Sequence, residues 1–302
     1  ANESAASFTF ADAEVGASYS YTISSDGGGS DVTGSGTIAT ATDQVSGLDL
    51  SALGSGTLTL SVVLTDPAGN AATAVTDSAT KDTIAPGLDL DSPLASDDLV
   101  GATEAAATTI SGSTADLADG QTVTVVVTDS ASDTVTGTPT VSADAWSVTL
   151  DLSGLANGAL TLTADAEDAS TNPATQATAN LTKDTRRPHG FSVAFDQDPV
   201  NAADADAASL SFTGAETGAS FAYTIRSSGG GKVTGSGTIS DAAQQITGID
   251  LTDLSDGTLT LVVTLTDTAG NTSGKRRDES TLDASQPAAT LTGPDTAQSD
   301  PF

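Results

Sequence analysis

The segment from Gly56 to Asn70, "GTLTLSVVLTDPAGN", contains the two features that decide the fold. Leu58, Leu60, Val62 and Leu64 recur every second residue, which is the period of a β-strand with one buried face. The "DPAGN" that follows consists largely of residues that favour tight turns, because Asp and Asn bond their own backbone and Gly accepts unusual dihedral angles. The segment therefore predicts a strand that ends in a turn.

This strand and turn occur three times in the 302 residues. The turn is "DPAGN" at 66–70, "DASTN" at 168–172 and "DTAGN" at 267–271, so the copies are 102 and 99 residues apart. Sixteen residues after the first Asp of each turn comes another Asp, followed four residues later by proline. These later acids are Asp82, Asp184 and Asp283. Self-similarity at a fixed spacing predicts tandem modules of about 100 residues, which is an ordinary domain size.

The predicted modules are 1–86, 87–187 and 188–286, and the second is the most divergent. The first module lacks an opening strand equivalent to "FSVAFDQDPV" at 191–200, and the start at Ala1 suggests a cut within a longer protein. Residues 287–302 resemble that missing strand. We therefore interpret 287–302 either as the first strand of a following module or as a donor strand for another subunit.

Short alternating segments separated by Gly, Asp, Asn and Ser predict an all-β fold, with each module a β-sandwich. Helical periodicity is absent apart from single turns. The linkers are short, so neighbouring modules are expected to abut end to end as a rod. Ten-residue strands rise about 33 Å, so three modules would span on the order of 110 Å.

Composition excludes several classes of function. Forty acids and nine bases give a net charge of −31, which repels nucleic acid and anionic membranes. No cysteine is present, so disulfides and thiolate chemistry are excluded. No apolar run reaches the ~18 residues of a membrane-spanning helix. Sandwiches joined end to end offer no deep cleft, so we expect no enzyme.

The repeated acids are the candidate site. The strand after each turn carries the later Asp to the opposite end of its module, so Asp82 is expected to meet the turn at 168–172, and Asp184 the turn at 267–271. Carboxylates and backbone carbonyls at a junction suit calcium, which binds six to eight oxygens. The ordinary explanation is that these acids stabilise turns or are solvated. The candidate metal ligands are Glu14, Asp66, Asn70, Asp82, Asp116, Asp119, Asp168, Asn172, Asp184, Glu216, Asp267, Asn271 and Asp283.

Three further residue types have structural explanations. Asp49, Asp151 and Asp250 precede "LS" or "LT" and are predicted to cap a short turn. Trp146 is predicted to lie in a core, and His189 is not part of a repeating ligand set.

The motifs "LTDPAGN", "KDTIAP" and "GAETGA" resemble the bacterial immunoglobulin-like repeats of giant adhesins secreted by type I systems, such as biofilm-associated and repeats-in-toxin adhesins. The resemblance implies immunoglobulin-like modules in an extracellular extender at the bacterial cell surface. It also implies calcium at the junctions, and a role in cell adhesion and biofilm formation. The linkers "KDTRRP" and "LDASQP" depart from this pattern.

Two other functions stay open. The chain could be a fibre subunit that polymerises by C-terminal strand donation, or a module that binds glycan or a host surface through exposed Thr-rich strands. The expected partners are neighbouring modules of the same chain or head-to-tail copies of it, with no nucleic acid and no membrane insertion.

Overall fold

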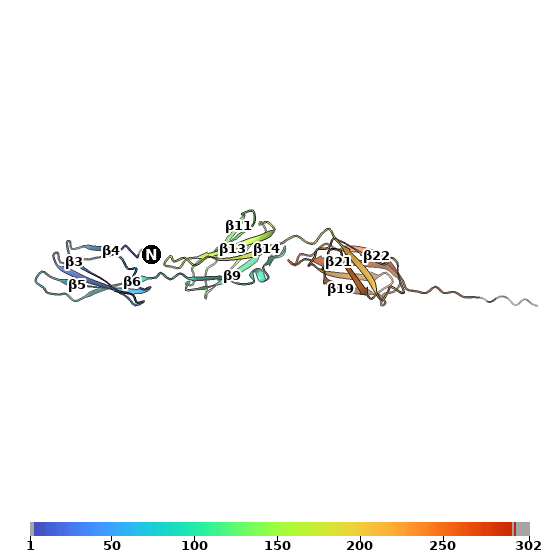
Figure 1. Ribbon diagram of the computed structural model, residues 1–302, viewed down its shortest axis with the longest axis horizontal. Helices are drawn as coiled ribbons and strands as arrows, with labels where there is room; N and C mark the ends of the chain where they lie inside the picture. Colours follow the sequence, from blue (N-terminus) through green and yellow to red (C-terminus); the bar gives the residue numbers. More distant parts are fainter. Residues whose placement is uncertain (1–2, 292, 294–302) are drawn as a thin grey trace, which may run out of the picture. The chain divides into compact units, whose positions relative to one another are not determined.

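The computed structural model describes residues 3–291 and 293, and it is built almost entirely of β-strands (Figure 1). The predicted all-β class is confirmed. The described residues form two compact units. One contains the residues up to Asp98 together with Ala107–Thr182, and the other contains Leu99–Ala106 together with the residues from Lys183 onward. Among the described residues, no helix has the length and apolarity needed to cross a membrane.

The first module is a sandwich of a two-stranded and a four-stranded sheet. Strand β1 (Ala6–Thr9) pairs with β4 (Gln44–Leu48). The second sheet has the order β3 (Val32–Thr37), β2 (Ser18–Ser25), β5 (Gly56–Thr65), β6 (Val75–Lys81). Ile23, Leu48, Leu53 and Leu58 are its buried centre, with Phe8 and Tyr21 packed against them.

The second module has a three-stranded sheet opposite a larger one. The first has the order β12 (Ala145–Leu150), β9 (Thr108–Ala115), β7 (Gly87–Leu90). The second contains β11 (Thr134–Gly137), β10 (Val123–Thr128), β13 (Gly158–Ala166) and β14 (Ala177–Lys183) in that order. Trp146 is 3% exposed, which confirms its predicted core position. A 3₁₀ turn, η1 (Leu94–Ser96), precedes β8 (Leu99–Val100), a strand in the segment that belongs to the second unit.

The third module repeats the first and adds two strands. Its smaller sheet has the order β15 (Ser192–Phe195), β17 (Ala208–Thr213), β20 (Gln245–Ile249). Its larger sheet has the order β16 (Val200–Asn201), β22 (Arg276–Asp283), β21 (Gly257–Thr266), β18 (Ser220–Ser227), β19 (Lys232–Thr238). Strand β16 lies parallel to β22, and the other pairs are antiparallel.

The predicted strand of Gly56–Thr65 is present in both the first and third modules, but its burial differs. The third-module strand β21 buries Leu259, Leu261, Val263 and Leu265 completely. Of the four equivalent residues in β5, Leu58 is buried, whereas Leu60, Val62 and Leu64 are only partly buried. Strand β15 contacts β21 and β22 in the third module, whereas the first module has no equivalent of β15 among its described residues. Residues 292 and 294–302, which contain most of the predicted extra strand, lie outside the described residues, so this strand stays a prediction.

Candidate functional site

The three Asp-x-x-x-Asn turns share one hydrogen-bonding pattern. In each turn, one carboxylate oxygen of the Asp accepts the backbone N–H of the Asn, at 2.7 Å for Asp66, 2.9 Å for Asp168 and 2.8 Å for Asp267. The other oxygen accepts the Asn side-chain amide, at 2.8, 2.8 and 2.9 Å in the same order. The carboxylates therefore close their own turns, as their ordinary explanation predicts.

These bonds favour the ionised carboxylate. The pKa values of Asp66 and Asp168 are lowered, first by the side-chain amide of the turn Asn and then by its backbone N–H. Bonds of this kind hold the turn at neutral pH and weaken only when the carboxylate is protonated in acid.

In the second unit the turn at 267–271 also bonds to two backbone segments beyond it. The amide of Asn271 donates to the backbone carbonyl of Asp184 at 2.8 Å, and its Oδ1 accepts the backbone N–H of Ala102 at 2.7 Å. Asp267 and Asn271 are both buried. The backbone at Gly101 approaches this turn so closely that a Cβ atom there would lie 2.1 Å from the carbonyl oxygen of Ala269. One asparagine thus ties together three backbone segments.

The first unit contains a matching contact. The amide of Asn172 donates to the backbone carbonyl of Asp82 at 3.2 Å as well as to Asp168. The expected placement of the linker next to the following turn is therefore observed twice. The interacting atoms differ from the expected ones, because Asp82 and Asp184 contribute their backbone carbonyls to the turn and not their carboxylates. The carboxylates of Asp82 and Asp184 instead accept the N–H groups of Ile84 and Arg186, two residues further on.

A cluster of negative charge surrounds the second-unit turn. Partial desolvation raises the pKa of Glu216, and the charges of Asp267 and Asp184 raise it further, while His189 opposes them. Among the described residues no three Asp, Glu, His or Cys side chains lie close enough to hold a metal ion by themselves. An ion would therefore need backbone or amide oxygens as well. The available donors are all oxygens, which fits calcium better than a transition metal.

The other predicted ligands are not brought together. Asp119 accepts the N–H of Ala143 at 2.8 Å within its own module, and Asp283 accepts the hydroxyl of Ser285 at 3.0 Å. Glu14 and Asp116 are exposed. In the part of the chain that the structure describes, no hydrogen bond links Asp116 or Asp119 to the Asp82 linker. The Asp66 turn likewise has hydrogen bonds only within its own module.

Sequence reasoning missed two buried lysines at equivalent positions, Lys81 at the end of β6 and Lys183 at the end of β14. Lys81 is buried, and its ammonium donates to the backbone carbonyls of Leu50 at 2.9 Å and Leu53 at 2.6 Å, with Glu3 at 3.6 Å. The six residues of β6 that precede Lys81 are all exposed, so the strand gave no alternation that would have signalled its burial. The third module has the buried apolar Leu282 at this position.

The predicted caps behave as expected. Asp49, Asp151 and Asp250 each accept the backbone N–H two residues further along, all at 2.9 Å. These bonds close short turns and leave the three carboxylates with a structural explanation.

Comparison with known proteins relates the chain to large adhesins. It matches no protein-family model and no curated protein. Among solved structures, a tetra-tandem repeat from the extending region of a large adhesion protein is 30% identical, with 93% of this chain and 70% of that chain covered and a TM-score of 0.34. A 1.5-MDa bacterial ice-binding adhesin is 25% identical over 94% of this chain and 92% of that chain, with a TM-score of 0.51.

A third structure, a Ca²⁺-stabilised adhesin that helps an Antarctic bacterium to reach out and bind ice, is 26% identical. The match covers 95% of this chain and 70% of the chain of that adhesin, with a TM-score of 0.44. The assignment depends on the 30% identity to the extending-region repeats and on the shape shared with the 1.5-MDa adhesin. The chain belongs to the bacterial immunoglobulin-like repeats of large adhesins.

Proposed function

We propose that this chain is a structural extender of a bacterial surface adhesin, whose tandem modules hold an adhesive domain away from the cell. The observation that carries the proposal is the bond from a turn asparagine to the backbone of the preceding linker. It occurs as Asn172 to Asp82 and again as Asn271 to Asp184. A contact repeated at the Asp82 and Asp184 linkers restrains both of them, which is what a spacer requires and a single ligand site does not.

Calcium stiffens these junctions in the proposed function. A carboxylate of Glu216, Asp267 or Asp184 would bind the ion together with backbone carbonyl and amide oxygens, and a divalent cation would offset the mutual repulsion of the three acids. Burial raises the pKa of Glu216 first, and the charges of Asp267 and Asp184 add to that rise, so a cation beside these acids would favour the ionised carboxylate. The proposed location is extracellular, at the bacterial surface, with a role in adhesion and biofilm formation and no enzymatic activity.

Solution scattering and thermal unfolding of the intact chain, with calcium and with chelator, test both parts. Calcium is expected to increase the maximum dimension toward about 110 Å and to raise the melting temperature. An extended particle whose dimensions and melting temperature do not depend on calcium would contradict the calcium role and leave the spacer role standing. A compact particle with calcium and with chelator would contradict the spacer role itself.

Matched variants identify the ligands. The double change Glu216→Gln with Asp184→Asn is expected to abolish the calcium-dependent rise in melting temperature. The control replaces two exposed acids outside the junction turns, Asp31→Asn with Asp253→Asn, and removes the same net charge. An equal loss in both variants would mean that calcium acts only by screening the total charge.

A second candidate function is a fibre subunit that receives a strand from a neighbour. It is favoured by a depression in the first module beside β1, lined among others by Phe8, Phe10, Leu60, Val62 and Val75. In the third module the corresponding side of β17 is paired with β15. Deletion of residues 288–302 would abolish assembly if the C-terminal segment is the donor, and filaments formed by the truncated chain would exclude it.

A further inference from the structure

The outward face of the large sheet in the third module carries a concentration of positive charge in a strongly acidic chain. Five of the nine basic residues lie in this module: Arg226, Lys232, Lys275, Arg276 and Arg277. Arg276 turns inward, where its Nε donates to the carbonyl of Phe191 at 3.0 Å and its guanidinium lies 5.2 Å from the Phe191 ring centre. The other four are exposed.

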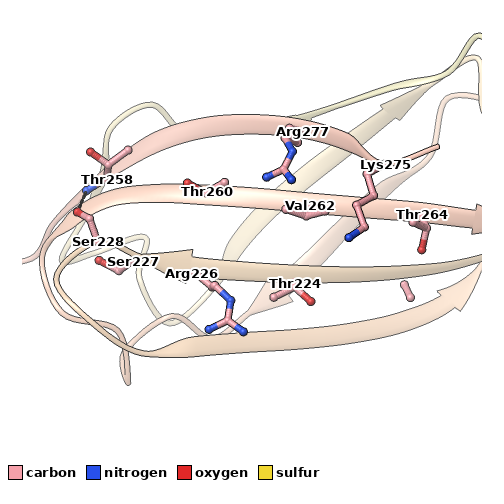
Figure 2. A pocket seen from close by; sticks show the side chains of 11 residues that line it. Thr224, Arg226, Ser227, Ser228, Thr258, Thr260, Val262, Thr264, Lys275 and Arg277 are labelled. Carbon is pink, nitrogen blue, oxygen red and sulfur yellow. Dashed lines mark hydrogen bonds between the residues drawn. The ribbon is translucent and has the colours of Figure 1, made fainter.

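Strand register places Arg226, Lys232 and Arg277 on one face of the sheet. Arg226 on β18 is opposite Lys232 on β19, and on its other side opposite Thr260 on β21. Arg277 on β22 is opposite Val262, which is opposite Thr224. Figure 2 shows Arg226, Lys275 and Arg277 on the same side of the sheet, around the row of Thr260, Val262 and Thr264. Together with Ser228 and Thr258 these residues line one open depression.

The four exposed cations have no partner among the residues that the structure describes. Over the described residues, none of the four forms an ion pair or donates a side-chain hydrogen bond. The outward-facing acids of β22 are Glu279, in the row of Thr260, and Asp283 at the end of the strand. Four cations against two acids leave a positive surface whose donors are free to bind an external group.

The fold does not require this charge. The repeat offsets align Arg226 with Ser24, Lys275 with Ala74 and Arg277 with Thr76. The first module forms the corresponding sheet, β3–β2–β5–β6, with these uncharged side chains. The positive face is therefore a property of one module, as expected for a binding surface and not for a device common to every extender module.

We propose that this face binds an acidic polysaccharide. Guanidinium groups pair in a fork with carboxylate or sulfate groups, and the surrounding Thr and Ser hydroxyls suit the hydroxyls of sugars. Strands about 4.8 Å apart and a rise of about 3.4 Å per residue separate the Cα atoms of Arg226 and Arg277 by about 12 Å. That separation suits successive anionic groups on an extended polymer better than one small anion.

Two other occupants fit less well. Protein interfaces are usually anchored by buried aromatic residues, and this face offers Thr, Ser and one Val at its centre. Single-stranded nucleic acid is usually held by aromatic rings that stack on its bases, and no aromatic residue lines the depression. Charge complementarity and hydroxyl content together favour the polysaccharide.

The test measures binding of the intact chain to polygalacturonate and to dextran sulfate at one fixed divalent-cation concentration, with uncharged dextran as the reference. The variant Arg226→Ser with Arg277→Thr introduces the first-module residues, so the fold is expected to be retained, and circular dichroism checks this. The control Arg186→Ser with Arg187→Thr removes two exposed linker guanidiniums and gives the same net charge.

We expect the wild-type chain to bind at least one acidic polymer and not the uncharged one. The sheet variant should bind at least tenfold more weakly, and the linker control should change affinity less than twofold. Equal weakening in both variants, equal binding of uncharged dextran, or no binding of either acidic polymer would overturn the proposal. Self-association that only the sheet variant abolishes would also overturn it, in favour of a second copy of the chain.

Discussion

Replacing Asn271 by alanine tests whether the asparagine of the turn, and not the turn alone, holds the linker. The change removes the amide that donates to Asp267 and to the carbonyl of Asp184, and the oxygen that accepts from Ala102. Asn70→Ala is the matched control, because Asn70 makes the same bond within its turn, to Asp66, and no side-chain bond to another module among the described residues.

The magnitude follows from the two additional bonds of Asn271. A hydrogen bond contributes about 1 kcal/mol net when water can replace the lost partner, and more when a buried group is left without one. Ala102 is exposed, so we use the lower figure for its N–H and expect about 2 kcal/mol for the two bonds together. At 1.4 kcal/mol per factor of ten, joint opening of the 99–106 segment and the Asp184 linker, the two partners of Asn271 outside its turn, should become about 30-fold more frequent.

Hydrogen exchange followed by mass spectrometry is the suitable assay, since a chain of several modules need not unfold in a single step. Exchange in 99–106 and in the linker that follows Asp184 should accelerate about 30-fold in Asn271→Ala and stay unchanged in Asn70→Ala. Acceleration of less than twofold in Asn271→Ala would refute the reasoning, because it would mean that the linker is held without this side chain.

Three further changes have defined outcomes. Because the pKa of Glu216 is raised in the folded chain, its ionisation opposes folding as pH rises above the ordinary value of 4.5; in chelator, Glu216→Gln should therefore raise the melting temperature at pH 7 and have no effect well below pH 4.5. Lys81→Met leaves two carbonyls without their donor and should destabilise the first module by about 1–3 kcal/mol in urea unfolding; an unchanged unfolding midpoint would show that these bonds do not stabilise the module. Gly101→Ala forces a Cβ atom against the carbonyl of Ala269 and should accelerate exchange in 99–106, whereas Gly154→Ala, which meets nothing within 4 Å, should not.

The strands and turns were predictable because their signals are local. The alternation in Gly56–Thr65 and the Asp–Asn turn after it depend on neighbouring residues, and both are observed. The sequence predicted that the Asp184 linker lies beside the turn at 267–271, but it did not predict the bond from Asn271 to the carbonyl of Asp184. Every residue has a backbone carbonyl, and no side-chain pattern identifies the one that accepts this bond. Burial of Lys81 opposes the usual exposure of lysine, so composition pointed away from it.

In these modules, the residues that contact the linkers differ from those that form the outward face of the large sheet. The Asp–Asn turn lies between two strands at one end of the module, and the bonds between its Asp and its Asn are the same in all three copies. The outward sheet face is free to vary, since Ser24 in the first module and Arg226 in the third occupy equivalent strand positions without altering the pairing of β2 with β5 or of β18 with β21. A chain of such modules can therefore acquire a binding surface in one copy while every junction keeps the contacts that restrain its linker.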